Sequence, residues 1–374
     1  MGLLRSVALH AIGTAYNLPI HIADRAAIAR GRHLEIVRQF GDAGRITAPN
    51  IAIVALHPSA ESIPFTLNLF RALREAEFFI LAFSTGPLGK FSIDLVGKCD
   101  CLIERRPVGR DFGSYQMGLS IIADRADMSR IERLVLANDS MFYPQSFGGT
   151  VKRMTARHSG WSCLFENFEH HYHAQSFFQM FGPAVFQSEA FKKFWRKYIP
   201  FSSRTRAINR GEVGLSRALG KAAFFPDAEY SGARIVDDAI KSLHSTDNLD
   251  DTAAGLATML GESWPRLLQR YRITTLGSKR NQGAFLADLA AEMSRRIERH
   301  NPTHCAALLS HHLFAAPIKR DLAYRDIFSI GTVMQQLRHY DDKEIAAIAR
   351  DLRIKGNVSS IGCLRRLLHS AGCI

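Results

Sequence analysis

The sequence predicts an α/β sandwich with a mostly parallel sheet, extended at both ends by helical segments. Between residues 51 and 186, apolar runs of strand length alternate with stretches of helical periodicity. Before and after that region the pattern is mostly helical. Strands and helices that alternate along a chain are typical of parallel sheets covered by helices on both faces.

The alternation defines each expected element in turn. Helical stretches follow several of the strands, and Pro64 is tolerated because it stands in the first turn of its helix. Strands are expected at 51–58, 78–86, 99–106, 131–140, 161–168 and 176–186, and helices at 61–76, 114–126 and 147–157.

Three segments are expected along the 374 residues. Residues 1–48 have the periodicity of one or two amphipathic helices, which either pack on the core or lie on a membrane surface; we favour packing. Residues 49–245 contain the alternating strands and helices. Residues 246–374 form a helical C-terminal subdomain.

The chain is basic, with a net charge of +13, which suggests an anionic partner: nucleic acid, acidic lipid or a phosphate-bearing substrate. Residues 192–221 contain nine Lys or Arg and one acid, Glu212. No apolar run reaches the roughly 18 residues of a membrane span, and the N-terminal stretch is unlike a signal peptide. We therefore expect a cytoplasmic protein. The six cysteines lack zinc-ribbon spacing and are expected to be reduced thiols.

Small polar side chains follow the apolar run that ends near residue 138. Asp139 stands between Asn138 and Ser140. A carboxylate in this setting suits Mg²⁺ or Mn²⁺, which are usually held by one or two carboxylates together with substrate phosphates. The alternative, a plain polar turn, is favoured on spacing alone. If this strand and the one at 99–106 are neighbours, the motifs that follow them line one crevice at the carboxyl ends of the sheet.

The second motif is the loop "VGRDFGSY" (108–115). Asp111 could bind a sugar hydroxyl while Arg110 or Arg105 contacts a phosphate; alternatively an internal Arg–Asp pair stiffens the loop. Gly109 and Gly113 could let the backbone approach a ligand closely. Because the spacing is not G-x-G-x-x-G, no dinucleotide site is expected.

Two further groups of residues could carry chemistry. His173, Gln175 and Ser176 form a polar strand entry that could face a sugar, and the histidines nearby lack the spacing of a zinc site. Glu212 is the one acid in a basic helical stretch. It could act as a general base, kept ionised by the surrounding arginines, or it could simply favour a helix start.

Taken together, these stretches resemble the rhamnan synthesis F family of bacterial glycosyltransferases, which build cell-wall, capsular and lipopolysaccharide glycans. The resemblance extends over about residues 50 to 340. It rests on "VGRDFGSY" (108–115), "LVLANDSMFYP" (134–144), "HAQSFFQMFGPAVFQSEAFKKFW" (173–195), "GEVGLSRAL" (211–219) and "NPTHCAALLSHHLFAAPIKRDL" (301–322).

The resemblance implies a GT-A-like Rossmann-type sandwich with the substrates in the crevice. The donor would be a nucleotide-diphosphate sugar, with rhamnose or another deoxysugar, and the acceptor an oligosaccharide or lipid-linked glycan at the inner face of the membrane. By this resemblance, the donor would be bound by Gly109, Arg110, Asp111 and Gly113 and by Asn138, Asp139 and Ser140. The last three stand where such enzymes carry Asp-x-Asp, and Asp139 would hold the Mg²⁺ or Mn²⁺. The sugar or acceptor would be bound by His173, Gln175 and Ser176, with Glu212 as the base and Asp111 as a second catalytic residue.

Three other functions remain open at this point. A nucleic-acid-binding protein fits the charge, but few aromatic side chains alternate with the basic ones as a stacking platform needs. A non-catalytic protein of a polysaccharide assembly complex could bind the membrane surface through basic segments. A sugar-phosphate transferase or hydrolase would use similar motifs.

Overall fold

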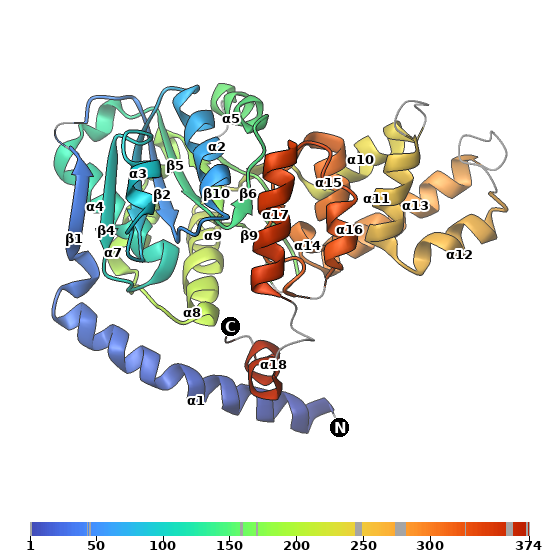
Figure 1. Cartoon of the computed structure of the whole chain (residues 1–374), viewed down its shortest axis with the longest axis horizontal. Helices are drawn as coiled ribbons and strands as arrows, with labels where there is room; N and C mark the ends of the chain where they lie inside the picture. Colours follow the sequence, from blue (N-terminus) through green and yellow to red (C-terminus); the bar gives the residue numbers. More distant parts are fainter. Residues whose placement is uncertain are drawn as a thin grey trace.

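The computed structural model describes residues 2–42, 44, 46–157, 160–169, 171–243, 249–273, 282–325, 327–356, 362–371 and 373. Figure 1 shows a sheet unit (residues 36–231) beside a helical unit (residues 232–356), with the N-terminal helix running beneath both. The predicted α/β class and the helical C-terminal part are confirmed.

Within the described residues, the main sheet has eight strands. They are β1 (Ile36–Gly41), β2 (Asn50–Leu56), β3 (Phe78–Ser84), β4 (Cys101–Arg105), β5 (Arg133–Asn138), β7 (Trp161–Cys163), β10 (Phe178–Phe181) and β11 (Asp227–Ala228). Their order is β1-β4-β3-β2-β5-β10-β7-β11. Strands β4, β3, β2 and β5 are parallel, whereas β1 and β10 pair antiparallel with their neighbours. The prediction of a mostly parallel sheet is therefore confirmed.

The central strands are apolar throughout because both of their faces are buried. Alternate residues of β2 enter different cores: Ala52 and Val54 join one cluster, and Ile51 and Ile53 join the other. Helices cover both faces. They are α2 (Ile63–Arg74), α3 (Phe91–Leu95), α4 (Arg110–Arg125), α5 (Phe147–Ala156), α6 (Pro183–Phe186), α7 (Glu189–Lys197), α8 (Arg204–Arg206), the π-helix η3 (Ala207–Glu212) and α9 (Val213–Gly220).

The strand order places a topological switch point between β2 and β5. The chain passes from β2 to β3 and β4 on one side, and then returns to β5 on the other side of β2. Connections therefore diverge at the carboxyl ends of these two strands, and open α/β sheets bind their ligands in the crevice that such a divergence leaves.

The helical unit is joined to the sheet unit by hydrogen-bonded backbone and by buried charge. Its helices are α10 (Gly232–Ser242), α11 (Leu249–Leu260), α12 (Ser263–Arg270), α13 (Gln282–Arg299), α14 (Pro302–Cys305), α15 (Ala307–Phe314), α16 (Ile330–Met334) and α17 (Asp342–Lys355). Its strand β12 (Ile318–Lys319) pairs with β6 (Met141–Phe142), which directly follows β5 and its turn. Residues of the two units thus meet beside the switch point.

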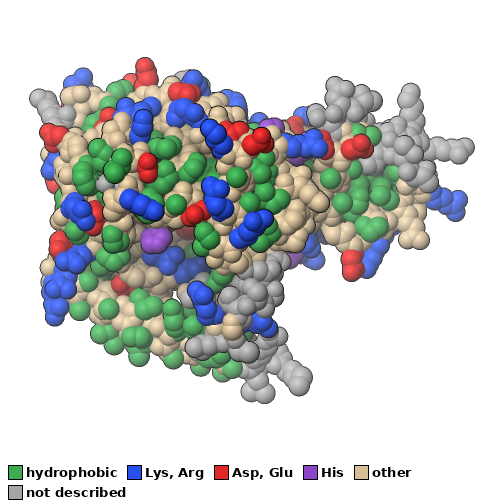
Figure 2. Space-filling view, viewed as in Figure 1, with side chains coloured by type: hydrophobic (Ala, Val, Ile, Leu, Met, Phe, Trp, Pro, Cys, Tyr) green, Lys and Arg blue, Asp and Glu red, His purple; other side chains and the backbone are tan. Residues whose placement is uncertain are grey.

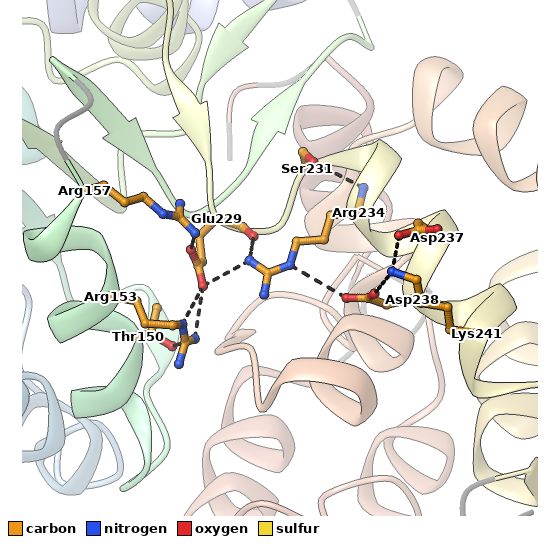
Figure 3. Close-up of polar contacts among 9 residues, drawn as sticks. All are labelled: Thr150, Arg153, Arg157, Glu229, Ser231, Arg234, Asp237, Asp238 and Lys241. Carbon is orange, nitrogen blue, oxygen red and sulfur yellow. Dashed lines mark hydrogen bonds and ion pairs between the residues drawn. The ribbon is translucent and has the colours of Figure 1, made fainter. Parts of the chain in front are cut away.

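A buried glutamate forms a second joint between the units. The Glu229 side chain is 0% exposed, and its carboxylate lies 3.0 Å from the guanidinium of Arg153 on α5 and 3.3 Å from that of Arg234 on α10 (Figure 3). Arg157 contacts the same carboxylate. Because one carboxylate bonds cations of both units, the helical unit is held in one orientation relative to the sheet.

Three of the predicted helices and strands differ from those in the structure. Residues 1–48 are not helical throughout, because β1 follows α1 (Gly2–Ala29) and pairs with β4; this edge strand is largely exposed and lacks an apolar pattern. Residues 161–168 form β7 and β8 (Glu166–Asn167) rather than one strand. The expected strand at 176–186 ends at Phe181, where Gly182 and Pro183 start α6. In the described part of the chain, no helix is long and apolar enough to cross a membrane.

Candidate active site

The loop at 108–115 and the polar residues 138–140 meet, although the strands before them, β4 and β5, are not neighbours. Strands β3 and β2 lie between β4 and β5, so the adjacency considered above as a condition does not occur. The contact arises because the first turn of α4 reaches across the strand ends. There the Asn138 side-chain amide donates to the Asp111 carboxylate at 2.9 Å. The Asn138 side-chain oxygen accepts from the Ser140 hydroxyl at 2.6 Å and the Ser140 backbone N–H at 3.1 Å.

Asp139 is fixed at the switch point itself. Its Oδ2 accepts a hydrogen bond of 2.8 Å from the backbone N–H of His57, the residue after β2. Its own N–H donates to Ala55 at 3.2 Å. Burial raises the pKa of Asp139, and the positive charge of Arg320 opposes that shift. The stretch is therefore both a polar turn, through Asn138 and Ser140, and a buried carboxylate held between two strands.

The glycines of the 108–115 loop serve close packing within the protein. Gly109 has a φ of +85°, and a Cβ added there would lie 2.2 Å from the Pro200 side chain. A Cβ on Gly113 would lie 2.3 Å from the Val108 carbonyl oxygen. The expected close approach thus occurs, but to Pro200 and Val108. Arg110 also has a positive φ, of 50°, and its side chain stays exposed.

Arg105 organises this loop and does not face a ligand. It is 2% exposed and donates to the carbonyl oxygens of Val108 at 2.6 Å and His33 at 3.1 Å. Burial lowers the pKa of its guanidinium to about 10. The suggestion that Arg105 contacts a phosphate is therefore wrong, because the guanidinium is buried and both of its terminal NH₂ groups donate to oxygens of the protein. Arg110 keeps that role as a prediction.

Asp111 lies in the first turn of α4, close to two other acids. Burial raises its pKa to about 6, and the charges of Asp139 and Glu212 add to the effect, while Arg110 opposes it. Three carboxylates near one another favour binding of positive charge or of hydroxyl donors. A carboxyl with this pKa is a candidate functional group, because such shifts concentrate at active sites.

The carboxylates can be tested against the predicted metal. Among the described residues, no group of three or more His, Cys, Asp or Glu side chains is arranged to hold a metal ion. Mg²⁺ that arrives with a diphosphate needs only one or two protein carboxylates. Asp139 and Asp111 therefore fit a cation that the substrate brings with it, and they do not form a complete resident site.

Glu212, His173 and Ser176 form a polar cluster near Asp111. Glu212 Oε1 accepts from the Ser176 hydroxyl at 2.6 Å, and Oε2 lies 3.5 Å from His173 Nε2. His173 Nδ1 contacts the His171 carbonyl oxygen at 2.7 Å. Glu212 stands at the end of the π-helix η3, a rare element that recurs at functional sites. It precedes α9 but forms no side-chain cap, so its carboxylate is directed to His173 and Ser176.

The two charges of this pair stabilise each other. Burial by itself would raise the pKa of Glu212, but the hydrogen bond and charge of His173, with the Ser176 hydrogen bond, lower it. Burial by itself would lower the pKa of His173, but the hydrogen bond and charge of Glu212 raise it. The pKa of Glu212 is lowered as expected, but the expected arginines are not the cause: His173 and Ser176 lower it, with a smaller contribution from Lys319.

Gln175 is placed differently from its neighbours. It is 3% exposed, and its amide donates to the Asn301 side-chain oxygen at 2.6 Å. Asn301 is the N-cap of α14, where its side chain accepts from the Thr303 N–H. Gln175 therefore fixes the helical unit against the sheet unit instead of facing the crevice.

The helical unit and the stretch before η3 supply basic side chains that sequence reasoning largely missed. Arg320 donates to the Asp139 carbonyl at 3.2 Å and forms a two-pronged pair with Asp351. Lys319, on β12, pairs in register with Met141 and lies near Glu212. Burial lowers the pKa of Arg204 to about 10, and its charge is close to those of Arg110 and Glu212. Figure 2 shows Lys, Arg and His side chains around the hollow between the sheet unit and α1.

Few signals in the sequence could have identified these groups. His57 follows an apolar strand and precedes Pro58, so its place at the carboxyl end of β2 was open to prediction. Asp321 pairs with Arg325 four residues later, a spacing typical of a helix face, although here both are largely buried. Arg204 is one of nine basic residues in its stretch, and nothing in the pattern distinguishes it.

Comparison with known proteins supports one assignment. The family described as rhamnan synthesis protein F matches residues 90–251, a stretch that contains every predicted site residue. The match is shorter than the expected 50–340 and leaves out the 301–322 stretch.

Relatives among known proteins are distant and partial. An uncharacterized protein, y4gN, of Sinorhizobium fredii is 28% identical over 124 residues, which cover 32% of this chain and 32% of that protein. Virulence protein VirA of Vibrio anguillarum is 30% identical over 83 residues, 22% of this chain and 27% of that protein. The matched part thus spans about a third or less of these relatives. The resemblance predicted from the motifs is confirmed: residues 90–251 match the family described as rhamnan synthesis protein F.

Proposed function

We propose that the protein is a glycosyltransferase with a GT-A-like sheet unit. It moves a sugar, rhamnose or another deoxysugar, from a nucleotide-diphosphate donor to a growing cell-surface polysaccharide or lipopolysaccharide. One observation carries this proposal: the carboxylates of Asp111, Asp139 and Glu212 lie near one another at the switch point, and Glu212 is paired with His173. The match to a rhamnan synthesis family supports it.

The basic groups around the crevice suit a diphosphate. Arg110 is exposed at the start of α4, and Arg204 and Lys319 contribute positive charge near Glu212. Arginine and lysine stabilise the charge that develops on a departing phosphate oxygen. We assign Arg110 to the diphosphate and Asp111 to a hydroxyl of the ribose or the sugar. Gly113, Asn138 and Ser140 then shape the donor side without direct chemistry.

The reaction assigned to Glu212 and its neighbours is abstraction of a proton from the acceptor, followed by displacement of the nucleotide diphosphate from the sugar. Glu212 accepts the proton of an acceptor hydroxyl, whose oxygen takes the place of the Ser176 hydroxyl on Oε1. That oxygen forms a bond to the anomeric carbon, the bond between that carbon and the diphosphate oxygen breaks, and its electron pair leaves with the diphosphate. His173 keeps Glu212 ionised between turnovers. A divalent cation that arrives with the diphosphate would be held by Asp139 and would neutralise the leaving group.

The proposal is tested by transfer itself. The protein is incubated with dTDP-, UDP- and GDP-linked sugars and a glycan acceptor fraction, and elongated glycan is detected by mass spectrometry. Wild-type protein should lengthen the glycan with one donor class, whereas Asp111→Ala and Asp139→Ala should not. Asp124→Ala, an exposed acid on the same helix as Asp111, is the matched control and should keep activity. Full activity of Asp111→Ala or Asp139→Ala removes that residue from the mechanism.

A further inference from the structure

Helix α1 packs against the protein with polar residues and presents an apolar face to solvent. Val7, Leu18 and Ile22 are 59%, 55% and 62% exposed, and their spacing places them on one face. Asn17 and Asp24 on the opposite side are buried, at 8% and 5%. Figure 2 shows hydrophobic side chains along the outer edge of the molecule, where α1 runs in Figure 1. An ordinary surface helix has the reverse arrangement, so this apolar face calls for a partner.

A basic groove adjoins this face. Arg25 lies three residues after Ile22 on the same side of α1 and lines a groove of about 1110 Å³ between α1 and helices α7 to α9. Other exposed cations around it are Lys193, Lys197, Arg206, Arg210, Arg217 and Lys221. The groove also has apolar lining, which includes Phe194 and Ile199. The apolar face and the groove together are called the α1 surface below.

The cations of the groove lack compensating charge from the protein. None of the seven forms an ion pair with any residue that the structure describes. Glu189, the one acid that lines the groove, pairs with Arg196 instead. Seven like charges around one groove repel one another, and an anionic partner relieves that repulsion.

We propose that the α1 surface docks on an anionic lipid bilayer. The apolar side chains of α1 enter the boundary between headgroups and acyl chains, while the groove cations contact lipid phosphates. Nucleic acid would satisfy the cations but would leave Leu18 and Ile22 exposed. A second copy of the chain would cover the apolar face but would bring the same cations together, because a twofold interface pairs identical surfaces. The bilayer satisfies both halves of the surface.

Docking would also orient the crevice. The Asp24 carboxylate, on the inward side of α1, accepts from the Ser202 N–H at 2.9 Å and from its hydroxyl at 2.6 Å. The Ser202 hydroxyl in turn accepts from the Gly109 N–H at 3.1 Å. The docking helix is therefore hydrogen-bonded through one residue to the loop that carries Asp111. The proposal concerns lipid binding and stands whether or not the crevice transfers a sugar.

Flotation with lipid vesicles tests the proposal on the full chain. Vesicles of pure phosphatidylcholine are compared with vesicles that contain about 30% phosphatidylglycerol, at about 0.1 M and about 1 M salt. Wild-type protein should float with the anionic vesicles at low salt only. Lys193→Ala combined with Arg217→Ala should weaken binding by about 25-fold, since each cation near an anionic surface contributes about fivefold. Leu18→Glu combined with Ile22→Glu should weaken it by at least about tenfold.

Two controls keep the result decisive. Ile93→Glu changes an apolar side chain that is 83% exposed on α3, and Arg266→Ala removes a cation of α12; both should bind like wild type. All variants must keep the wild-type Tm, because every changed side chain is exposed. Equal binding to neutral and anionic vesicles, or wild-type binding by the Leu18→Glu, Ile22→Glu protein, overturns the proposal. A wild-type protein that does not bind vesicles but dimerises in sedimentation velocity, with the dimer lost in the Leu18→Glu, Ile22→Glu variant, assigns the surface to a second copy instead.

Discussion

Replacing Glu212 with Gln separates its charge from its shape. Glutamine keeps an oxygen that can accept the Ser176 hydrogen bond of 2.6 Å, but it cannot take up a proton or pair with His173 at 3.5 Å. Loss of a general base lowers kcat by about a hundred- to ten-thousandfold. The folded state loses one charge-assisted contact, so the free energy of unfolding should fall by only about 1–3 kcal/mol.

The same change should alter the titration of His173. Its pKa is raised by Glu212 above the usual 6.5, so in Glu212→Gln burial dominates and the pKa should fall below that value. In the wild type, the His173 contribution to stability is complete below pH 6.5 and is lost as pH rises through its raised pKa. The Glu212 contribution is complete above pH 4.5 and is lost as pH falls through its lowered pKa. The Glu212–His173 pair should therefore stabilise the fold most between pH 4.5 and pH 6.5.

The assay measures release of nucleotide diphosphate with saturating donor and acceptor, and an NMR titration follows the His173 ring protons. Glu189→Gln, at a side chain that is 78% exposed, is the matched control and should change neither kcat nor the His173 titration. A Glu212→Gln enzyme with kcat close to wild type would show that Glu212 is not the base. An unchanged His173 pKa would refute the pairing itself.

Two further changes test the loop and its acid. Gly109→Ala should lower the free energy of unfolding by about 2–5 kcal/mol in a denaturant titration, because the left-handed backbone and the Cβ contact of 2.2 Å with Pro200 both oppose a side chain. Gly283→Ala, on a helix with open space around it, should be neutral or slightly stabilising. Equal effects at both sites would contradict the packing described. Asp111→Asn should stabilise the fold at pH 7 by up to about 3 kcal/mol, because a carboxyl with its pKa raised from 3.8 to about 6 destabilises the fold when ionised. Donor binding should be lost in the same variant. The gain in stability should disappear below pH 4, and a pH-independent effect would contradict this reasoning.

The sheet was predictable from the sequence where its strands are buried on both faces. Strands β2 to β5 each contain an apolar run, and each was placed within a few residues. β1 was not predictable, because an edge strand that is mostly exposed carries no apolar pattern. The order of the strands was equally hidden, since local periodicity does not say which strands pair.

The candidate site was predictable as a set of residues but not as a geometry. Asp111, Asp139 and Glu212 were identified because polar residues follow buried strands or interrupt a basic stretch. The direction of each side chain depends on partners far away in the sequence. Arg105 donates to Val108 in its own loop but also to His33, 72 residues away, and Gln175 is bonded to Asn301, 126 residues away. No sequence pattern identifies such partners before the fold brings them together.

Calorimetric titration of the full chain with UDP, GDP, dTDP and CMP, each with and without Mg²⁺ or Mn²⁺, tests most directly whether the crevice is a donor site. The account predicts that one nucleotide binds, that binding is lost in Asp111→Ala, and that a metal effect on binding disappears in Asp139→Ala. If the folded wild-type protein binds none of the four, the crevice is not a donor site of this kind, and the transferase assignment is contradicted.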